Sequence, residues 1–253
     1  MINDSHFRVE VISRTPDPQR SIYAAMHQDY SHKFVYDDLD VFHGWKDPYR
    51  VGEYLDEKEA GLRVIRNCLK FKHFGPLEHP QIILNIGGFP HSTMQQYRTH
   101  RTGVSFDCQS FRYTSKMILN AVDDPITIQR VFYIRPVGYY TNGKGKKCEY
   151  THEMRKADLG FCYLAAVRYK ELYEAGLPEE HCRSIIPFDI RQNWVMSMNL
   201  RAAFHIIEMR STADVQPESQ VLAGMILEKI RDWCPEVTEY FIEKRIGKNL
   251  SAP

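Results

Sequence analysis

The sequence lacks the features that mark membrane, secreted and thiol-metal proteins. No stretch approaches the roughly 18 consecutive apolar residues that a membrane-spanning helix needs. The beginning, Met1 to Arg8, has no apolar core of a secretion signal, and the six cysteines form no Cys-x-x-Cys pair. We therefore expect a cytoplasmic protein with reduced, structural or incidental cysteines, no bound metal and no membrane partner.

Net charge is also nearly absent, because 33 basic residues are balanced by 32 acidic ones and the formal net charge is +1. No global positive field would draw such a chain to nucleic acid or to an anionic membrane surface. Any binding of anions must therefore depend on arginines that the fold gathers locally, and we expect no nucleic-acid partner.

No repeat, low-complexity run or obvious linker divides the chain of 253 residues, and its hydrophobic content of 43% can fill a sizeable core. The pattern predicts one α+β domain over residues 1–253, with a central mixed or antiparallel sheet flanked by helices. Strands are predicted over 7–13, 80–86 and 127–137. Helices are predicted over 57–72, 153–175, 199–210 and 218–232, with short ones after Ser92 as a cap and between Pro178 and Pro187. Irregular loops or turns are predicted over 35–55 and 139–147.

The densest polar cluster lies between Gln95 and Tyr113 and includes Arg98, Arg101 and Arg112, with a histidine, serines and a glycine among them. A guanidinium offers a rigid fork of donors that fits a phosphate, and a loop with serine and glycine adds hydroxyl and backbone donors. This segment indicates an anionic, phosphorylated ligand, while a solvated basic face remains the alternative.

A second cluster lies on the helix predicted over 199–210. Helical geometry places Arg210 among Ala203, Ile206 and Ile207 on the apolar stripe. A guanidinium in such a place needs an anion or several acceptors, and an internal salt bridge would satisfy it as well as a ligand would. Other polar side chains gather on another face of the helix: Arg201, His205 and Glu208.

Two further segments carry weaker signals. The segment His73-Phe74-Gly75-Pro76-Leu77-Glu78-His79 is typical of a polar turn after a helix. Its histidines and glutamate could ligate a metal only with further ligands that the sequence does not supply. Arg183 stands alone before Pro187, where a surface charge is the simplest interpretation.

Taken in order, these four segments resemble the motifs of the flavin-dependent thymidylate synthases. The family signature is an Arg-His-Arg group followed by Ser-x-Arg-Tyr, which Arg98-Thr99-His100-Arg101 and Ser110-Phe111-Arg112-Tyr113 match. Thr99 splits the first group, and Cys108 stands where many members carry glutamate. The 73–79 turn, Arg183 and the 199–210 helix match other motifs of the family, so the resemblance runs from about residue 7 to residue 245.

The resemblance implies the residues of a nucleotide site and of a flavin site. For dUMP it implies Gln95, Arg98, Cys108, Gln109, Ser110, Phe111, Arg112, Arg183 and Arg210. For FAD it implies Gly75, Glu78, Arg98, His100, Arg101, Asp107, Cys108, Asn199, Arg201 and His205. His73 and Tyr113 would lie near the flavin and the folate. Arg210 is the implied catalytic residue, which would face the uracil and stabilise charge that develops on it.

The reaction that the resemblance implies is the reductive methylation of dUMP to dTMP without a cysteine nucleophile. FAD is the implied bound cofactor, NADPH the reductant and methylene-tetrahydrofolate the carbon donor, in a homotetramer whose active sites are shared between subunits. The principal alternative is a nucleotide- or RNA-binding protein without catalysis, which would stack bases on aromatics and arginines. A further alternative is a cysteine-dependent methylase in which Cys108 is essential.

Overall fold

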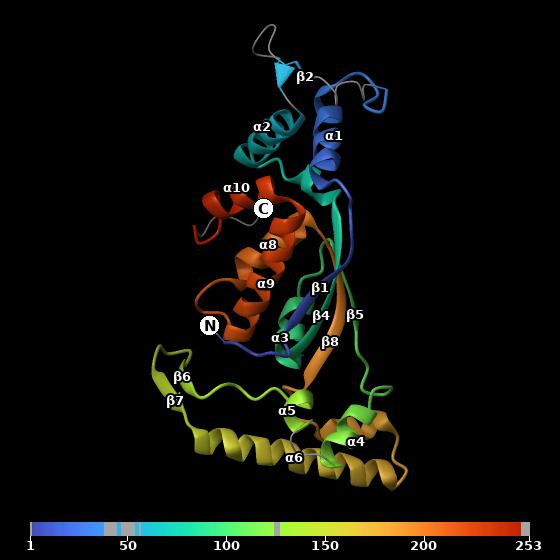
Figure 1. Cartoon of the computed structure of the whole chain (residues 1–253), viewed down its shortest axis with the longest axis vertical. Coiled ribbons are helices and arrows are strands. Elements are labelled where there is room, and N and C mark those ends of the chain that lie inside the picture. The colour runs from blue at the N-terminus through green and yellow to red at the C-terminus, as the bar shows by residue number, and fades with distance from the viewer. Residues whose placement is uncertain (1, 38–44, 47–53, 56, 124–126, 249–253) are drawn as a thin grey trace. The chain divides into compact units, whose positions relative to one another are not determined.

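The computed structural model describes residues 2–37, 45–46, 54–55, 57–123 and 127–248, and its contacts divide them into two compact units (Figure 1). The first unit comprises Met1–Arg8, Asn85–Thr99 and Phe106–Val195. The second unit comprises Val9–Leu84, His100–Ser105 and Met196–Pro253. The expectation that residues 1–253 form a single domain therefore stays a prediction.

A four-stranded sheet is the principal β structure, and the boundary between the units passes through each of its strands. Alternation explains its long strand, since Ile82, Leu84 and Ile86 are fully buried while their neighbours are more exposed. The strands follow one another across the sheet in the order β1 (Arg8–Arg14), β4 (Gln81–Pro90), β8 (Arg191–Asn199) and β5 (Val104–Cys108).

The two central strands run antiparallel. In the second unit the N–H of Leu200 donates to the carbonyl of Pro80, and in the first unit the N–H of His91 donates to that of Ile190. The start of one strand therefore pairs with the end of the other. The expected α+β class with a central antiparallel sheet is confirmed.

The second unit holds most of the long helices. Asp17 caps the first of them by accepting a hydrogen bond from the N–H of Arg20 at 3.0 Å. The last three helices pack in sequence (Figure 1). The rings of Phe204 and Phe241 stack with their centroids 4.1 Å apart. Its elements are α1 (Pro18–Tyr30), the short antiparallel pair β2 (Trp45–Lys46) and β3 (Tyr54–Leu55), α2 (Glu57–Lys70), η2 (Gly75–Glu78), α8 (Leu200–Arg210), α9 (Pro217–Trp233) and α10 (Pro235–Lys244).

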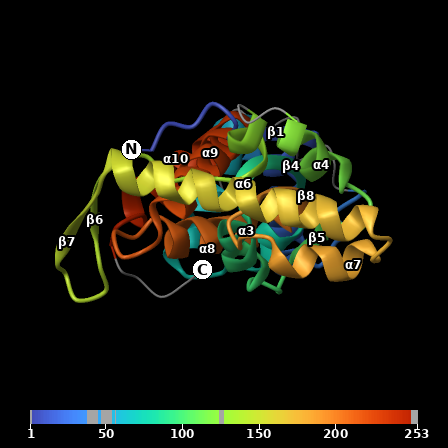
Figure 2. The ribbon, with the colours of Figure 1, turned by 90° about the horizontal axis from the view of Figure 1, so that it is seen from below.

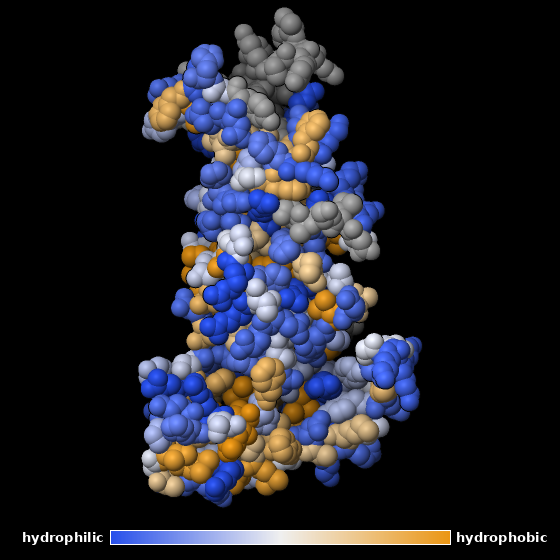
Figure 3. Space-filling view, turned by 180° about the vertical axis from the view of Figure 1, so that it is seen from behind, coloured by the Kyte–Doolittle hydropathy of each residue, from blue (hydrophilic) through white to orange (hydrophobic). Residues whose placement is uncertain are grey.

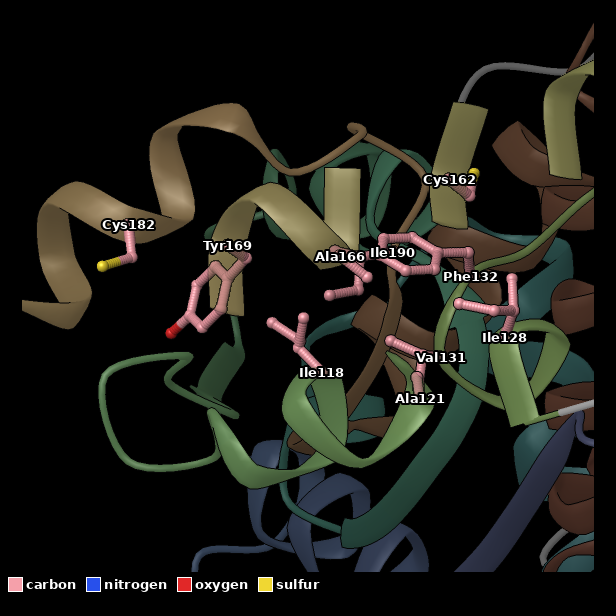
Figure 4. Packing of buried hydrophobic residues seen from close by; sticks show 10 residues of the cluster. All are labelled: Ile118, Ala121, Ile128, Val131, Phe132, Cys162, Ala166, Tyr169, Cys182 and Ile190. Carbon is pink, nitrogen blue, oxygen red and sulfur yellow. The ribbon is translucent and has the colours of Figure 1, made fainter. Parts of the chain in front are cut away.

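The first unit is built around one long helix, α6, which α4 accompanies along its side (Figure 2). Thr151 caps α6 by accepting from the N–H of Met154 at 3.3 Å. The buried side chains of Ile118, Ala166 and Tyr169 meet between the two helices (Figure 4). The elements are α3 (His91–Arg98), α4 (Lys116–Asp123), α5 (Ile128–Val131), the hairpin β6 (Gly138–Thr141) and β7 (Lys147–Tyr150), α6 (His152–Glu174), α7 (Glu179–Cys182) and η4 (Arg183–Ile185).

The strand predicted over 127–137 is wrong. Ile128 to Val131 form helix α5, and Phe132 makes only an isolated bridge with Ile190. The β-branched and aromatic composition favoured a strand, but the spacing of Ile128, Val131 and Phe132 also suits one helical face. All three side chains are buried in the cluster between α4 and α6, so packing decided against local propensity.

Two smaller predictions also need correction. Ser92 does not cap α3, because Pro90 occupies the cap position and no side chain caps that helix. The expected irregular turn over 139–147 is the end of an ordered hairpin, in which Tyr140 pairs with Cys148. The loop expected over 35–55 lies largely outside the described residues. The helices expected over 57–72, 153–175, 199–210 and 218–232 are confirmed to within two residues at each end.

The structure also bears on the cysteines and on the expected lack of a membrane-spanning helix. All six cysteines are free thiols, and Cys68, Cys162, Cys182 and Cys234 are buried. Within the part of the chain that the structure describes, none of the helices has the length and apolar character needed to cross a membrane.

A buried arginine ties together three distant segments of the first unit. Arg191 is 6% exposed and donates to the Asp4 carboxylate at 2.7 Å, to the carbonyl of Gly88 at 2.6 Å and to that of Gln129 at 2.8 Å. Burial alone would raise the pKa of the Asp4 carboxyl, but the hydrogen bond and charge of Arg191, together with the hydrogen bonds from His6, outweigh it and the pKa is lowered. Asp4 also accepts from the N–H of His6, so the removal of Arg191 would take away the cationic partner of Asp4 and one donor to each of the two carbonyls.

We predict that Arg191→Ala lowers the free energy of unfolding by about 3–5 kcal/mol, because it removes the cationic partner of the partly buried Asp4 carboxylate and the donor to two backbone carbonyls. Arg168→Ala is the matched control, since its ion pair with Glu171 is exposed to solvent. Arg168→Ala should lower the free energy of unfolding by less than about 1 kcal/mol. Urea unfolding of both variants decides the matter, and similar losses would contradict the role assigned to Arg191.

Candidate functional site

The first turn of α8 is held by a motif glycine from far away in the sequence. Gly103 has a φ of +68°, which favours glycine, and a Cβ atom there would lie 2.4 Å from the side-chain nitrogen of Asn199. The N–H of Asn199 donates to the carbonyl of Gly103 at 3.1 Å. The Asn199 side chain in turn caps α8 by accepting from the N–H of Ala202 at 2.8 Å. The 98–103 motif and the Asn199-x-Arg201 motif therefore meet at this junction.

The motif histidine contacts the expected catalytic arginine. Arg210 lies in the last turn of α8, and its Nε donates to Nε2 of His100 at 3.1 Å. The rings of His100 and His205 meet edge to face, with centroids 5.4 Å apart. Because Nε2 of His100 accepts this bond, the proton of the neutral ring must be on Nδ1. Arg210 and His205 therefore reach the same partner, although helical geometry had suggested different faces.

Electrostatics keep His100 neutral near pH 7. Burial, the positive charge of Arg210 and the neighbouring His205 together lower its pKa from 6.5 to about 4, with burial the largest cause. A neutral imidazole can accept a hydrogen bond from a guanidinium, whereas an imidazolium would repel it. The contact therefore places one fixed positive charge, on Arg210, beside an uncharged ring.

A second cluster joins the 73–79 turn to α8 and to the residue after α10. Arg201 forms an ion pair with Glu78, and its guanidinium lies 5.9 Å from the centre of the Phe74 ring. Arg245 lies 5.3 Å from the same ring centre and donates to Glu208 at 2.9 Å. Phe74 thus contacts two guanidinium groups, a geometry in which cations are attracted to aromatic faces. The sequence had indicated neither Phe74 nor Arg245, because only the fold brings Arg245 to the turn.

The other expected residues of the second unit lie on its surface. Arg101 is exposed, and His73 lies 3.7 Å from Asp29 with both side chains half exposed. Gly75 begins the short helix η2, where nothing lies near the position of a Cβ atom. Among the residues that the structure describes, no three potential ligands from histidine, cysteine, aspartate and glutamate gather to hold a metal ion.

In the first unit, the turn after β5 carries the expected phosphate-binding arginine. Arg112 is exposed, forms an ion pair with Glu180 at 3.0 Å and lies 5.8 Å from the centre of the Tyr113 ring. The hydroxyl of Ser110 accepts from the N–H of Arg112 at 3.4 Å, so the two residues share one turn. Arg183 is an exposed residue of η4, three residues after Glu180. Solvent-exposed guanidinium groups can take up an anion from solution.

Cys108 is not activated as a nucleophile. It is half-buried, its sulfur lies 3.5 Å from that of Met94, and burial raises the pKa of its thiol despite the opposing charge of Arg98. Asp107 raises this pKa as well. The thiolate, which is the reactive form, is therefore scarce at neutral pH.

The remaining expected residues of this unit support the turn from within. The N–H of Gln109 donates to the carbonyl of Asn193, and the Gln109 side chain bonds Thr114 and the N–H of Asn193. Phe111 packs against the core cluster between α4 and α6. Gln109 and Phe111 are thus placed by structural contacts, with Gln109 fixed at both ends.

The structure distributes the expected site residues between its two units. The first unit holds Gln95, Arg98, Asp107, Cys108, Gln109, Ser110, Phe111, Arg112, Tyr113 and Arg183. The second unit holds His73, Gly75, Glu78, His100, Arg101, Asn199, Arg201, His205 and Arg210. Direct contacts within the second unit join His100 to Arg210 and Arg201 to Glu78. Most residues expected to bind flavin therefore belong to one compact unit, and most of those expected to bind nucleotide belong to the other.

The sequence is similar to those of known proteins. The family model for thymidylate synthase complementing protein matches residues 10–236. A flavin-dependent thymidylate synthase of Haloarcula marismortui is 32% identical, over 97% of this chain and 99% of that protein. One from Halobacterium salinarum is 31% identical, over 97% of this chain and 100% of that protein.

A solved structure shares the fold. The crystal structure of a UMP/dUMP methylase, PolB from Streptomyces cacaoi bound with 5-Br dUMP, is similar with a TM-score of 0.70 and 18% sequence identity. The similarity covers 99% of both chains. At this identity the likeness shows the fold alone.

We predict a stability that depends on pH through His100. Between pH 6.5 and about 4 the unfolded chain binds a proton at this histidine that the folded chain does not, so the free energy of unfolding falls as the pH falls through this range. His100→Gln keeps an acceptor near the position of Nε2 but cannot titrate. Urea unfolding at several pH values should therefore show a shallower loss for His100→Gln than for the unaltered protein, and parallel curves would contradict the prediction.

Proposed function

Because the chain belongs to the flavin-dependent thymidylate synthase family, we propose that it is a methyltransferase that converts dUMP to dTMP by reductive methylation. FAD is the bound cofactor, NADPH the reductant and methylene-tetrahydrofolate the carbon donor. The observation that carries the proposal is the contact between Arg210 and the neutral ring of His100, which sets a fixed positive charge beside the family motif. Neither the net charge of +1 nor the named relatives favour the alternative of an RNA-binding protein without catalysis.

The donor set of the second unit fits a flavin nucleotide. FAD carries an anionic diphosphate, and the exposed Arg101 and half-exposed Arg201 are cations that could bind it. Glu78 holds the guanidinium of Arg201 in place, and the Asn199 cap fixes the first turn of α8 from which Arg201 projects. When bound, FAD supplies the transfer of reducing equivalents, which no side chain can provide.

The turn of the first unit fits a nucleotide phosphate. Ser110, Arg112 and Arg183 would hold the phosphate of dUMP, with the two guanidinium groups supplying charge-assisted hydrogen bonds. The ion pair with Glu180 and the ring of Tyr113 hold Arg112 near one conformation before the nucleotide arrives. Since both guanidinium groups are exposed, a phosphate can replace water around them at small cost in buried charge.

The role proposed for Arg210 is electrostatic. Methylation requires electron density to shift onto the uracil ring so that its C5 atom can attack the one-carbon unit. A guanidinium that faces the ring stabilises that shifted state more than the ground state, which is what lowers a barrier. The bond to His100 fixes the direction of the guanidinium without neutralising it, because the ring carries no charge. His73 and Tyr113 would lie near the flavin and the folate.

A cysteine-dependent route is not supported by the surroundings of Cys108. The rival methylase mechanism needs a thiolate to attack the pyrimidine, but burial and Asp107 both raise the pKa of this thiol. Cys108 would instead line the nucleotide and flavin sites without forming a covalent bond.

An exposed apolar face suggests that copies of the chain associate. Met154, Phe161 and Leu164 are exposed large side chains of α6, and their spacing places them on one side of that helix. Hydrophobic side chains gather visibly over the part of the first unit that contains α6 (Figure 3). Exposed apolar patches of this kind mark protein–protein contacts. We propose that this face serves assembly into a homotetramer with shared active sites.

The function is tested with purified protein, FAD, NADPH, methylene-tetrahydrofolate and dUMP. The protein should take up FAD, NADPH should bleach the flavin absorbance, and the complete mixture should form dTMP. Cys108→Ser should lower the rate of dTMP formation less than about tenfold, because no bond to sulfur is needed. No uptake of FAD at micromolar concentration, or complete loss of dTMP formation in Cys108→Ser, would overturn the proposal or its mechanism respectively.

We predict that Arg210→Ala and Arg210→Lys both lower the rate of dTMP formation by about 10²-fold or more, because lysine keeps the charge but loses the planar fork. FAD should still bind, and NADPH should still bleach it without dUMP. The matched control is Arg231→Ala, which removes an exposed arginine paired with Glu239. If Arg210 has only a structural role, its variants should melt at lower temperature while the folded fraction forms dTMP at the normal rate.

A further inference from the structure

A histidine that belongs to none of the family motifs lies at the centre of a hydrogen-bond chain in the first unit. His91 is the first residue of α3 and is half-buried. Its Nδ1 lies 3.1 Å from Oε1 of Gln192, and its Nε2 lies 2.8 Å from Nε2 of Gln95. Gln192 is 1% exposed and donates from its own Nε2 to the carbonyl of Gln109 at 2.6 Å. The chain therefore connects two residues expected to bind dUMP, Gln95 and Gln109.

The hydrogen bonds that link Gln95, His91, Gln192 and Gln109 allow only one consistent arrangement of protons. The side-chain nitrogen of Gln192 is a donor and is used on Gln109, so its oxygen must face His91 and accept. Nδ1 of His91 therefore carries the proton, and Nε2 of the neutral ring is left with a lone pair. That lone pair can only accept, and the atom that approaches it is the amide nitrogen of Gln95.

This arrangement fixes which way the amide of Gln95 points. A glutamine side chain can turn over and exchange its oxygen for its nitrogen, and on a free surface it does so at little cost. Here the turned amide would set its oxygen against the lone pair of His91, which is repulsive. Among the described residues, the oxygen of Gln95 has no hydrogen-bond partner, so this oxygen and the second N–H remain available to a ligand.

The hydrogen-bond chain is held in place at the end that lies away from Gln95. Gln192 lies in β8 and is buried, and the N–H of His91 itself donates to the carbonyl of Ile190 at 2.9 Å. The ring of Phe188 meets that of His91 edge to face, with centroids 5.2 Å apart. His91 is therefore held by its backbone, by its ring face and by Nδ1, which leaves Nε2 to direct Gln95.

We propose that His91 is a positioning residue of the nucleotide site, which holds the Gln95 amide in the one orientation that suits dUMP. The proposal rests on the proposed function, because it takes dUMP as the ligand that Gln95 meets. His91 itself makes no contact with the nucleotide. It acts by being an acceptor at Nε2, so a substitution that preserves an acceptor there preserves nucleotide binding.

Two substitutions of similar size test the two ring nitrogens of His91 one at a time. In His91→Asn the amide takes the place of Nδ1, so the bond to Gln192 can persist but the acceptor for Gln95 is lost. In His91→Gln the amide reaches the place of Nε2, so an oxygen can accept from Gln95 while the bond to Gln192 is lost. Either variant removes one neutral hydrogen bond from the same position, so a merely structural role predicts similar effects.

The measurement is the dissociation constant of dUMP for the FAD-loaded protein, followed through the flavin absorbance, together with the melting temperature. We expect His91→Asn to weaken dUMP binding about three- to tenfold, as for one misdirected neutral hydrogen bond. His91→Gln should remain within about twofold of the unaltered protein. FAD content should be the same in both variants, because His91 lies outside the flavin-binding residues.

A double-mutant cycle tests whether the effect passes through Gln95. If it does, Gln95→Leu and Gln95→Leu with His91→Asn should bind dUMP equally, since nothing is left for His91 to orient. Equal weakening by His91→Asn and His91→Gln, or additive effects in the cycle, would overturn the positioning role. Failure of the unaltered protein to bind dUMP would instead overturn the proposed function, so the two failures are distinguishable.

Discussion

The second unit depends on the contact between Gly103 and Asn199. The backbone at Gly103 has a positive φ and leaves no room for a side chain, which lets the motif segment lie directly on the start of α8. Asn199 then caps the helix by accepting a hydrogen bond from the N–H of Ala202. This first turn fixes the orientation of α8, and with it the direction of the polar side chains along the helix, because a helix is rigid over three turns. Its consequence is that His100 and Arg210 meet at the far end of α8.

The charges of the molecule fall into two kinds, according to burial. Arg191 and Arg245 are buried and satisfied by carboxylates or carbonyls, so they serve the fold. Arg112 is exposed and Arg201 is half-exposed, and each forms an ion pair with a carboxylate while it remains accessible to solvent. A net charge of only +1 is therefore compatible with the proposed anion sites, because solvent-accessible arginines lie at particular places while most other charges neutralise one another.

Neutral groups are as important to the candidate site as charged ones. His100 accepts from Arg210 only because burial and the adjacent cation keep its ring uncharged. His91 accepts from Gln95 because Gln192 has already fixed the proton on the opposite ring nitrogen. In both places an imidazole acts as a fixed acceptor, and the direction of a neighbouring side chain depends on its tautomer.

The sequence by itself determined the family and the confirmed long helices, since these depend on local spacing and residue type. It also predicted which arginines bind anions, and that assignment stays a prediction. The structure adds that Thr151 and Asn199 cap two of the confirmed helices through hydrogen bonds within the first turn. Only the tertiary structure decided that Ile128 to Val131 form a helix, because their burial against α4 and α6 outweighed local strand propensity. It alone also brought Arg245 to Phe74 and His91 to Gln192, since hydrogen bonds and ring contacts between distant segments leave no periodic signal in the sequence.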